Sequence, residues 1–270
     1  MLFLICEKSK REGKIMIYDL QKASVLKRIS AGLLDLILSV IVAVGACLLI
    51  SKIVNYDEKS EKLDSFYQIY EEKYGFNFSE VTEEMFNEFT QEQKDNYNEA
   101  YKELIQDKEF LRTYDLIVNL TLLIATFGIM IGILVIEFVI PLFLKNGQTI
   151  GKKCFGICLM MENGVKVRTL PLLIRALLGK FTIETMILCY FLVMAFFGNI
   201  YLLYLLIVVA IILVNIVLVF VNRKKGMIHD LISYIVVVDK ESQLIFETEE
   251  ELIKYKERIS LEENAKKKTF

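Results

Sequence analysis

Four long apolar stretches constrain this chain more than any other feature. A transmembrane helix needs about 20 mainly apolar residues to cross the hydrocarbon core of a bilayer. Four segments reach that length with at most three charges each: residues 29–50, 116–144, 170–197 and 201–221. We therefore predict an all-α polytopic membrane protein with four transmembrane helices, the last two joined by a tight turn at residues 198–200.

The distribution of Lys and Arg predicts the orientation of these spans. Basic residues precede the first span, fill the loop between the second and third, and follow the fourth, whereas the other side has only Lys52 and Arg112 near the membrane. Because cytosolic flanks carry the excess of Lys and Arg, we expect both termini in the cytosol and the protein in the plasma membrane. Residues 1–6 are too short for a signal-peptide core, so we expect no cleaved leader. Translation could start at Met1 or at Met16.

The segments outside the spans predict one outer and one cytosolic folded part. Residues 51–115 are acidic, and their aromatic residues recur at helical spacing, which predicts two or three amphipathic helices. Gly75 is placed to end the first of them, and Thr90 with Gln93 resembles a capping box that opens the last. On the cytosolic side, residues 156–161 and 165–168 predict a β-hairpin, and residues 232–239 predict a further strand that pairs with it.

These patterns divide the chain into successive parts. The expected boundaries are a cytosolic N-terminal segment at 1–28, transmembrane helices at 29–50, 116–144, 170–197 and 201–221, an extracytoplasmic acidic helical insertion at 51–115, a cytosolic loop with a β-hairpin at 145–169, a cytosolic His-Asp motif and strand at 222–246, and a charged C-terminal tail at 247–270.

Three motifs resemble the RDD family of membrane proteins: KRISAGLLD at residues 27–35, NGQTIGKKCFGI at 146–157 and KKGMIHDLISYIVVVD at 224–239. The Arg and two Asp for which the family is named correspond to Arg28, Asp35 and Asp230. The similarity covers about residues 23–239, with the outer loop as an insertion relative to shorter members. It implies a membrane protein that transports a ligand or exchanges cations for protons.

The central motif needs a separate interpretation, because GQTIGKK resembles a phosphate-binding loop. A P-loop has four residues between its glycines and a Ser or Thr after the Lys, and this segment has neither. We interpret it as a tight turn at the inner membrane face, whose lysines contact lipid head groups.

Charged residues within the spans are the candidate site, because such residues are costly in a membrane and mark a function or an ion pair. From a rise of about 1.5 Å per residue, we expect one layer of charges in the cytosolic half of the membrane, with further polar residues at its rim. The layer is Asp35, Glu137, Lys180 and Glu184, and the rim is Arg28, Arg175, His229 and Asp230.

This layer supports two opposed hypotheses. Three carboxylates beside one Lys leave at least one of them protonated or ready to bind a cation, which suits a carrier of a small ligand or an exchanger of monovalent cations for protons. Four helices are few for a monomeric carrier, so this hypothesis includes a homo-oligomer. In the structural alternative, Lys180 pairs with Glu184 and Arg28 pairs with Asp230, and the charges only fix helix packing.

A different class of function is a membrane-embedded interaction or regulatory subunit that binds a membrane-protein partner through its outer acidic helices. An enzyme is not expected, because the sequence shows no nucleophile–base pair, metal-ligand cluster or nucleotide loop. One His and five Cys without paired spacing predict no metal and no cofactor. A net charge of −2 gives no reason to expect nucleic acid as a partner.

Overall fold

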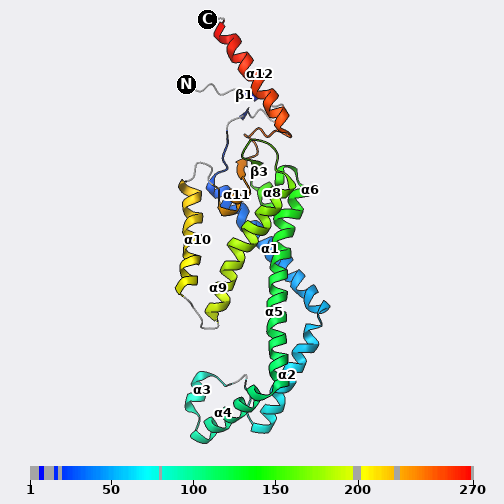
Figure 1. The fold of residues 1–270 in the computed structure, drawn as a ribbon, viewed down its shortest axis with the longest axis vertical. Helices are drawn as coiled ribbons and strands as arrows, with labels where there is room; N and C mark the ends of the chain where they lie inside the picture. The colour runs from blue at the N-terminus through cyan, green and yellow to red at the C-terminus, as the bar shows by residue number, and fades with distance from the viewer. Residues whose placement is uncertain are drawn as a thin grey trace. The chain divides into compact units, whose positions relative to one another are not determined.

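The computed structural model describes residues 6–8, 15–17, 20–78, 81–196, 202–221 and 226–268, so the predicted turn at 198–200 lies outside the described residues. The chain is mostly helical and forms two compact units (Figure 1). Unit 1 comprises Met1–Ala43 and Ile129–Phe270, and unit 2 comprises Val44–Gly128.

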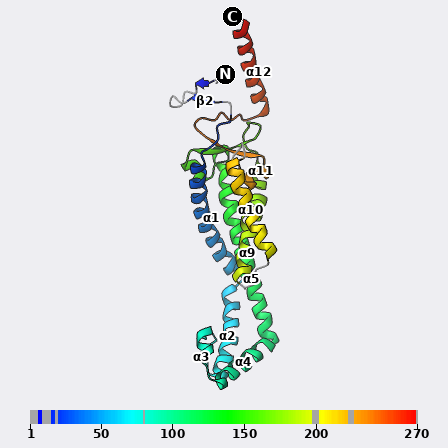
Figure 2. The same cartoon turned by 90° about the vertical axis from the view of Figure 1, so that its left-hand side faces the viewer.

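The apolar stretches form long helices. They are α1 (Val25–Ile53), α5 (Lys108–Leu134) with the π-helix η1 (Val135–Val139) and α6 (Ile140–Phe143), α8 (Thr169–Ile174) with the π-helix η3 (Arg175–Met186) and α9 (Ile187–Phe196), and α10 (Leu202–Val221). The first three of these are long and apolar enough to cross a membrane, and α10 contains a shorter apolar stretch, Leu202–Leu218. Figure 2 shows α9 and α10 side by side.

The part of α1 in unit 1 shows why these helices suit a lipid environment. Ala31, Asp35 and Ser39, spaced four residues apart on one face, are buried, while Leu33, Leu36 and Ile37 between them are exposed. Leu33 and Ile37, for example, are 57% and 58% exposed. Water would disfavour such a surface, whereas hydrocarbon accommodates it.

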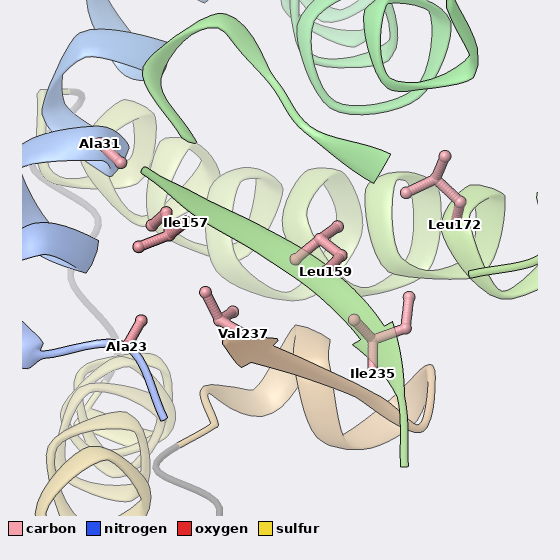
Figure 3. Close-up of a cluster of buried hydrophobic side chains, with 7 residues drawn as sticks. All are labelled: Ala23, Ala31, Ile157, Leu159, Leu172, Ile235 and Val237. Atoms are coloured by element: carbon pink, nitrogen blue, oxygen red, sulfur yellow. The ribbon is translucent and has the colours of Figure 1, made fainter. Parts of the chain in front are cut away.

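A two-stranded antiparallel sheet lies beside the helices of unit 1. Strand β3 (Ile157–Met161) pairs with β4 (Ile235–Asp239) so that Leu159 lies opposite Val237. Figure 3 shows one face of this sheet packed with apolar side chains, together with Ala31 of α1 and Leu172 of α8. The other face is buried too, so both strands are apolar except for Asp239 at the end of β4.

The prediction that residues 165–168 form a second hairpin strand beside β3 is wrong. Residues 166–168 form no strand, and Val165 makes a single bridge, with Phe246. The turn at Asn163 and Gly164 is present, but the chain leaves it toward α8 instead of running back along β3. Strand β3 pairs with β4 instead, which agrees with the prediction of a further strand within residues 232–239.

Shorter elements complete unit 1. They are β1 (Cys6–Lys8) paired with β2 (Ile15–Ile17), the 3-10 turn η2 (Lys145–Gly147), α7 (Ile150–Cys154), α11 (Ile228–Ile232) and α12 (Glu249–Lys268). Leu252 and Tyr255 attach the charged helix α12 to Val165 and Phe246.

Unit 2 contains three helices between its two long ones: α2 (Tyr56–Tyr74), α3 (Glu83–Glu88) and α4 (Gln91–Gln106). Gly75 ends α2 in the left-handed conformation, with φ of 76°, and Thr90 with Gln93 forms the predicted capping box. The core is apolar and aromatic, and it includes Leu63, Leu104, Phe110 and Ile117.

Candidate functional site: a buried cluster of ion pairs

The predicted site residues lie together around one cavity in unit 1. The cavity has a volume of about 280 Å³, and α1, η1, α7, η3 and α11 contribute to its wall. All eight predicted residues line it, so the expected layer and rim form a single cluster. Its charged and titratable members are Arg28, Asp35, Glu137, Lys152, Arg175, Lys180, Glu184, His229 and Asp230.

Asp35 holds the GQTIGKK segment against α1. Its carboxylate accepts hydrogen bonds from the Thr149 hydroxyl at 2.5 Å and from the Gly151 backbone N–H at 2.8 Å. The Lys152 ammonium lies 3.6 Å from the same carboxylate. A glycine is required at 151, because a Cβ atom there would lie 2.3 Å from the carbonyl oxygen of Ala31. Asp35 therefore holds the N-terminal end of α7 against α1.

Glu137 is the most heavily paired carboxylate. Its Oε2 accepts from Arg175 at 2.6 Å and from Lys152 at 3.1 Å, and its Oε1 accepts from Lys180. Its side chain is 2% exposed. Three cationic groups on one carboxylate more than compensate its charge, so Glu137 offers little electrostatic attraction to a further cation.

Lys152 is a site residue that the sequence interpretation missed, because it was assigned to lipid head groups. The structure buries it between Asp35 and Glu137. Burial lowers the pKa of its ammonium to about 8, even though the charge of Glu137 opposes this change. The signal available in the sequence was its place in the motif, one residue after the glycine that packs on α1.

Asp230 joins the two arginines. Its carboxylate accepts from Arg175 Nε and from Arg28, each at 2.9 Å, and His229 Nε2 lies 3.3 Å away. Burial alone would raise the pKa of Asp230, but His229, Arg175 and Arg28 outweigh it and hold that pKa well below its usual value. The predicted pairing of Arg28 with Asp230 is present.

Glu184 pairs with His229, whose Nδ1 lies 2.8 Å from Oε1. The predicted pairing of Glu184 with Lys180 is wrong, since Lys180 contacts Glu137 instead. Helix η3 passes α11 so closely that a Cβ at Gly179 would lie 2.4 Å from that of His229. This close passage brings the imidazole within reach of Glu184.

The charges of the cluster balance differently from the prediction of three carboxylates against one Lys. Four carboxylates meet two Arg and two Lys, and three of the carboxylates contact at least one of these four cations. Among the described residues, Glu184 is the exception, because its direct ion-pair partner is a histidine. The compensation of Glu184 therefore depends on whether His229 is protonated.

The fold and this cluster together define a helical membrane-type protein with a cavity lined in part by buried ion pairs. The family model of the RDD family matches residues 22–234, so the chain belongs to the RDD family. The resemblance seen in the three motifs is thereby confirmed. Neither the curated proteins nor the solved structures contain a match to the chain.

Proposed function

We propose that this protein exchanges a monovalent cation for a proton, and that Glu184 and His229 carry out the exchange. The observation that supports the proposal is that Glu184 lines the cavity of the charged cluster and has a histidine as its ion-pair partner. A bound cation and a protonated imidazole can each balance the same carboxylate, so binding of one favours loss of the other.

The exchange step conserves charge. A cation without its water shell approaches the Glu184 carboxylate from the cavity, and the proton on His229 leaves to solvent, so the pair carries the same total charge before and after. In the reverse direction, protonation of His229 restores its interaction with Glu184 and releases the cation. Asp230 remains beside His229 Nε2 throughout and orients the ring.

The other carboxylates of the cluster take no part in the exchange step, because they already have cationic partners. Glu137 and Asp230 already have Arg and Lys partners, which gives them little affinity for a further cation. Asp35 positions Lys152 through α7. The sequence placed the cation-binding role on at least one of Asp35, Glu137 and Glu184, and we assign it to Glu184.

The proposal includes the membrane arrangement expected from the sequence: four spans, cytosolic termini, the plasma membrane, no enzymatic activity and a homo-oligomer. Residues of α1, α9 and α10 support it, because many of their apolar side chains are exposed. A second copy of the chain or the surrounding lipid would cover these surfaces.

Proton movement in proteoliposomes tests the exchange. With a pH-sensitive dye inside the vesicles, gradients of sodium, potassium or lithium should drive proton flux through the wild type. Glu184→Gln and His229→Gln should reduce this flux by about tenfold or more. Glu72→Gln, which neutralises an exposed acid in unit 2, is the matched control and should leave the flux unchanged.

Thermal melting of each variant separates loss of function from loss of fold. An absence of flux in the wild type with all three cations would refute the proposal. So would full activity in a folded Glu184→Gln variant.

A partner-binding role is the second candidate, and an observation in unit 2 favours it. Ile69 of α2 and Tyr101 and Ile105 of α4 are 59%, 51% and 42% exposed, respectively, on two helices that are rich in charged residues. Cross-linking in native membranes tests this role. A stoichiometric partner that is retained in Glu184→Gln and lost in Tyr101→Ser would support binding in place of exchange.

A further inference from the structure

A second cavity has η3 and α9 on one side and α10 on the other. Its volume is about 220 Å³, and its wall is mainly aliphatic, with Ile183, Ile187, Val208 and Ile211 among the lining residues. Two polar side chains, Glu184 and Asn215, also line it. An apolar cavity with a few placed polar groups is the usual form of a small-molecule site.

Glu184 belongs to both cavities. Together with Met227 it lines the charged cavity and the apolar one, so it stands between them. Its Oε1 contacts His229, and its Oε2 makes no hydrogen bond to any described residue. The carboxylate is therefore fixed at one oxygen and retains a second one that can accept a hydrogen bond.

Asn215 provides a second polar contact, from α10. Its Oδ1 accepts a hydrogen bond from the Ile228 backbone N–H at 3.0 Å, which fixes the orientation of the amide. Within the described part of the chain, its Nδ2 has no hydrogen-bond partner. The cavity therefore presents one acceptor with negative charge and one neutral donor, on opposing helices.

We propose that this cavity binds a small amphipathic amine, with its ammonium on Oε2 of Glu184 and its apolar body among the aliphatic side chains. The charge of the carboxylate selects a cation and rejects an anion. The aliphatic wall selects an apolar body over a hydrated metal ion. Drug-sized sites measure roughly 300–1,000 Å³, so this cavity fits a smaller molecule with a short hydrocarbon or single-ring body.

The flank of the cavity indicates how such a molecule reaches it. Leu188 and Ile212, which line the cavity, are 42% and 49% exposed. The opening is therefore apolar, and an amphipathic amine dissolved in the bilayer could enter through it. A lipid acyl chain could enter by the same opening, but it would leave the free carboxylate oxygen without a donor. This site goes beyond the proposed function, because occupancy of the cavity requires no transport.

Binding of 2-phenylethylamine, compared with its neutral counterpart 2-phenylethanol, tests the site. The full chain in lipid nanodiscs is dialysed against each compound, and empty nanodiscs correct for partition into lipid. The wild type should bind the amine about tenfold or more tightly than the alcohol, because a charged hydrogen bond is about twice as strong as a neutral one.

Three variants sharpen the test. Glu184→Gln should abolish the preference for the amine and retain binding of the alcohol. Val208→Phe fills the cavity and should weaken the binding of both compounds. Glu72→Gln is the control for overall acidity and should bind as the wild type does.

Equal affinity of the wild type for amine and alcohol would overturn the proposal, because the ammonium group would then contribute nothing to binding. Preference for the amine in a folded Glu184→Gln variant would also overturn it. If Glu184→Gln fails to fold, the ratio of the wild-type affinities for amine and alcohol and the binding by Val208→Phe still test the proposal. Amine binding without cation flux would refute the proposed exchange alone, and flux without amine preference would refute this site alone.

Discussion

The buried ion pairs of unit 1 contrast with the exposed ion pairs of unit 2. In unit 1, Arg175 and Glu137 form a pair at 2.6 Å in which each side chain is 2% exposed. In unit 2, Lys62 and Glu109 form a pair at 2.7 Å with side chains 54% and 66% exposed. The distances are nearly equal, so the difference lies in the surroundings of the two pairs.

This difference teaches what each set of charges contributes. A charge removed from water loses its hydration and depends entirely on its partners, so deletion of one partner leaves the other uncompensated. A charge on a surface keeps its hydration and loses little when its partner is removed. Unit 2 stabilises itself through an aromatic and aliphatic core, whereas unit 1 builds part of its interior from charges that must remain matched.

The strongest way to break the comparison is to neutralise the most heavily paired carboxylate. Glu137→Gln leaves Arg175, Lys152 and Lys180 facing a neutral amide, and it should lower the free energy of unfolding of unit 1 by about 3–5 kcal/mol. Thermal and denaturant unfolding in detergent would measure this loss. If Glu137→Gln unfolds at the same temperature and denaturant concentration as the wild type, these pairs do not stabilise the interior.

A substitution of intermediate effect examines packing around the same cluster. Gly179→Ala places a Cβ against His229 and should cost about 1–3 kcal/mol. Gly32→Ala is its control on α1, because an added Cβ there meets nothing within 4 Å. Melting of both variants measures the effect, and equal stability would show that the close passage of η3 and α11 is not under constraint.

The smallest effect is expected on the surface of unit 2. Lys62→Met removes the exposed pair with Glu109 and should change stability by less than about 1 kcal/mol. Chemical denaturation resolves a change of this size. A loss as large as that of Glu137→Gln would remove the distinction between the two units.

Much of the fold follows from local patterns in the sequence. Apolar length identifies the long helices, Gly75 marks the end of α2, and Thr90 with Gln93 marks the start of α4. The candidate site residues could also be identified, because charges are conspicuous in apolar segments. Their partners could not, since a partner depends on how separate segments pack.

The wrong pairing of Lys180 with Glu184 has a specific cause. Residues four apart share a face in an α-helix, but Arg175–Met186 forms a π-helix, with hydrogen bonds between residues five apart. Lys180 contacts Glu137 of η1 and Glu184 contacts His229 of α11, so each side chain takes its partner from a neighbouring element and not from its own helix. Glu137 also lies in a π-helix, Val135–Val139. Nothing in the residue pattern indicates these π-turns or the partners that neighbouring elements supply, so a pairing inferred within one helix fails at the site.

The position of His229 has a practical consequence for spectroscopy. It is the single histidine of the 270-residue chain, and its two ring nitrogens lie 2.8 Å from Glu184 and 3.3 Å from Asp230. Isotopic labelling of histidine alone would therefore give one imidazole resonance set, with one nitrogen reporting on each carboxylate. The chain thus carries its own reporter at the centre of the charged cluster, with no need for an introduced probe.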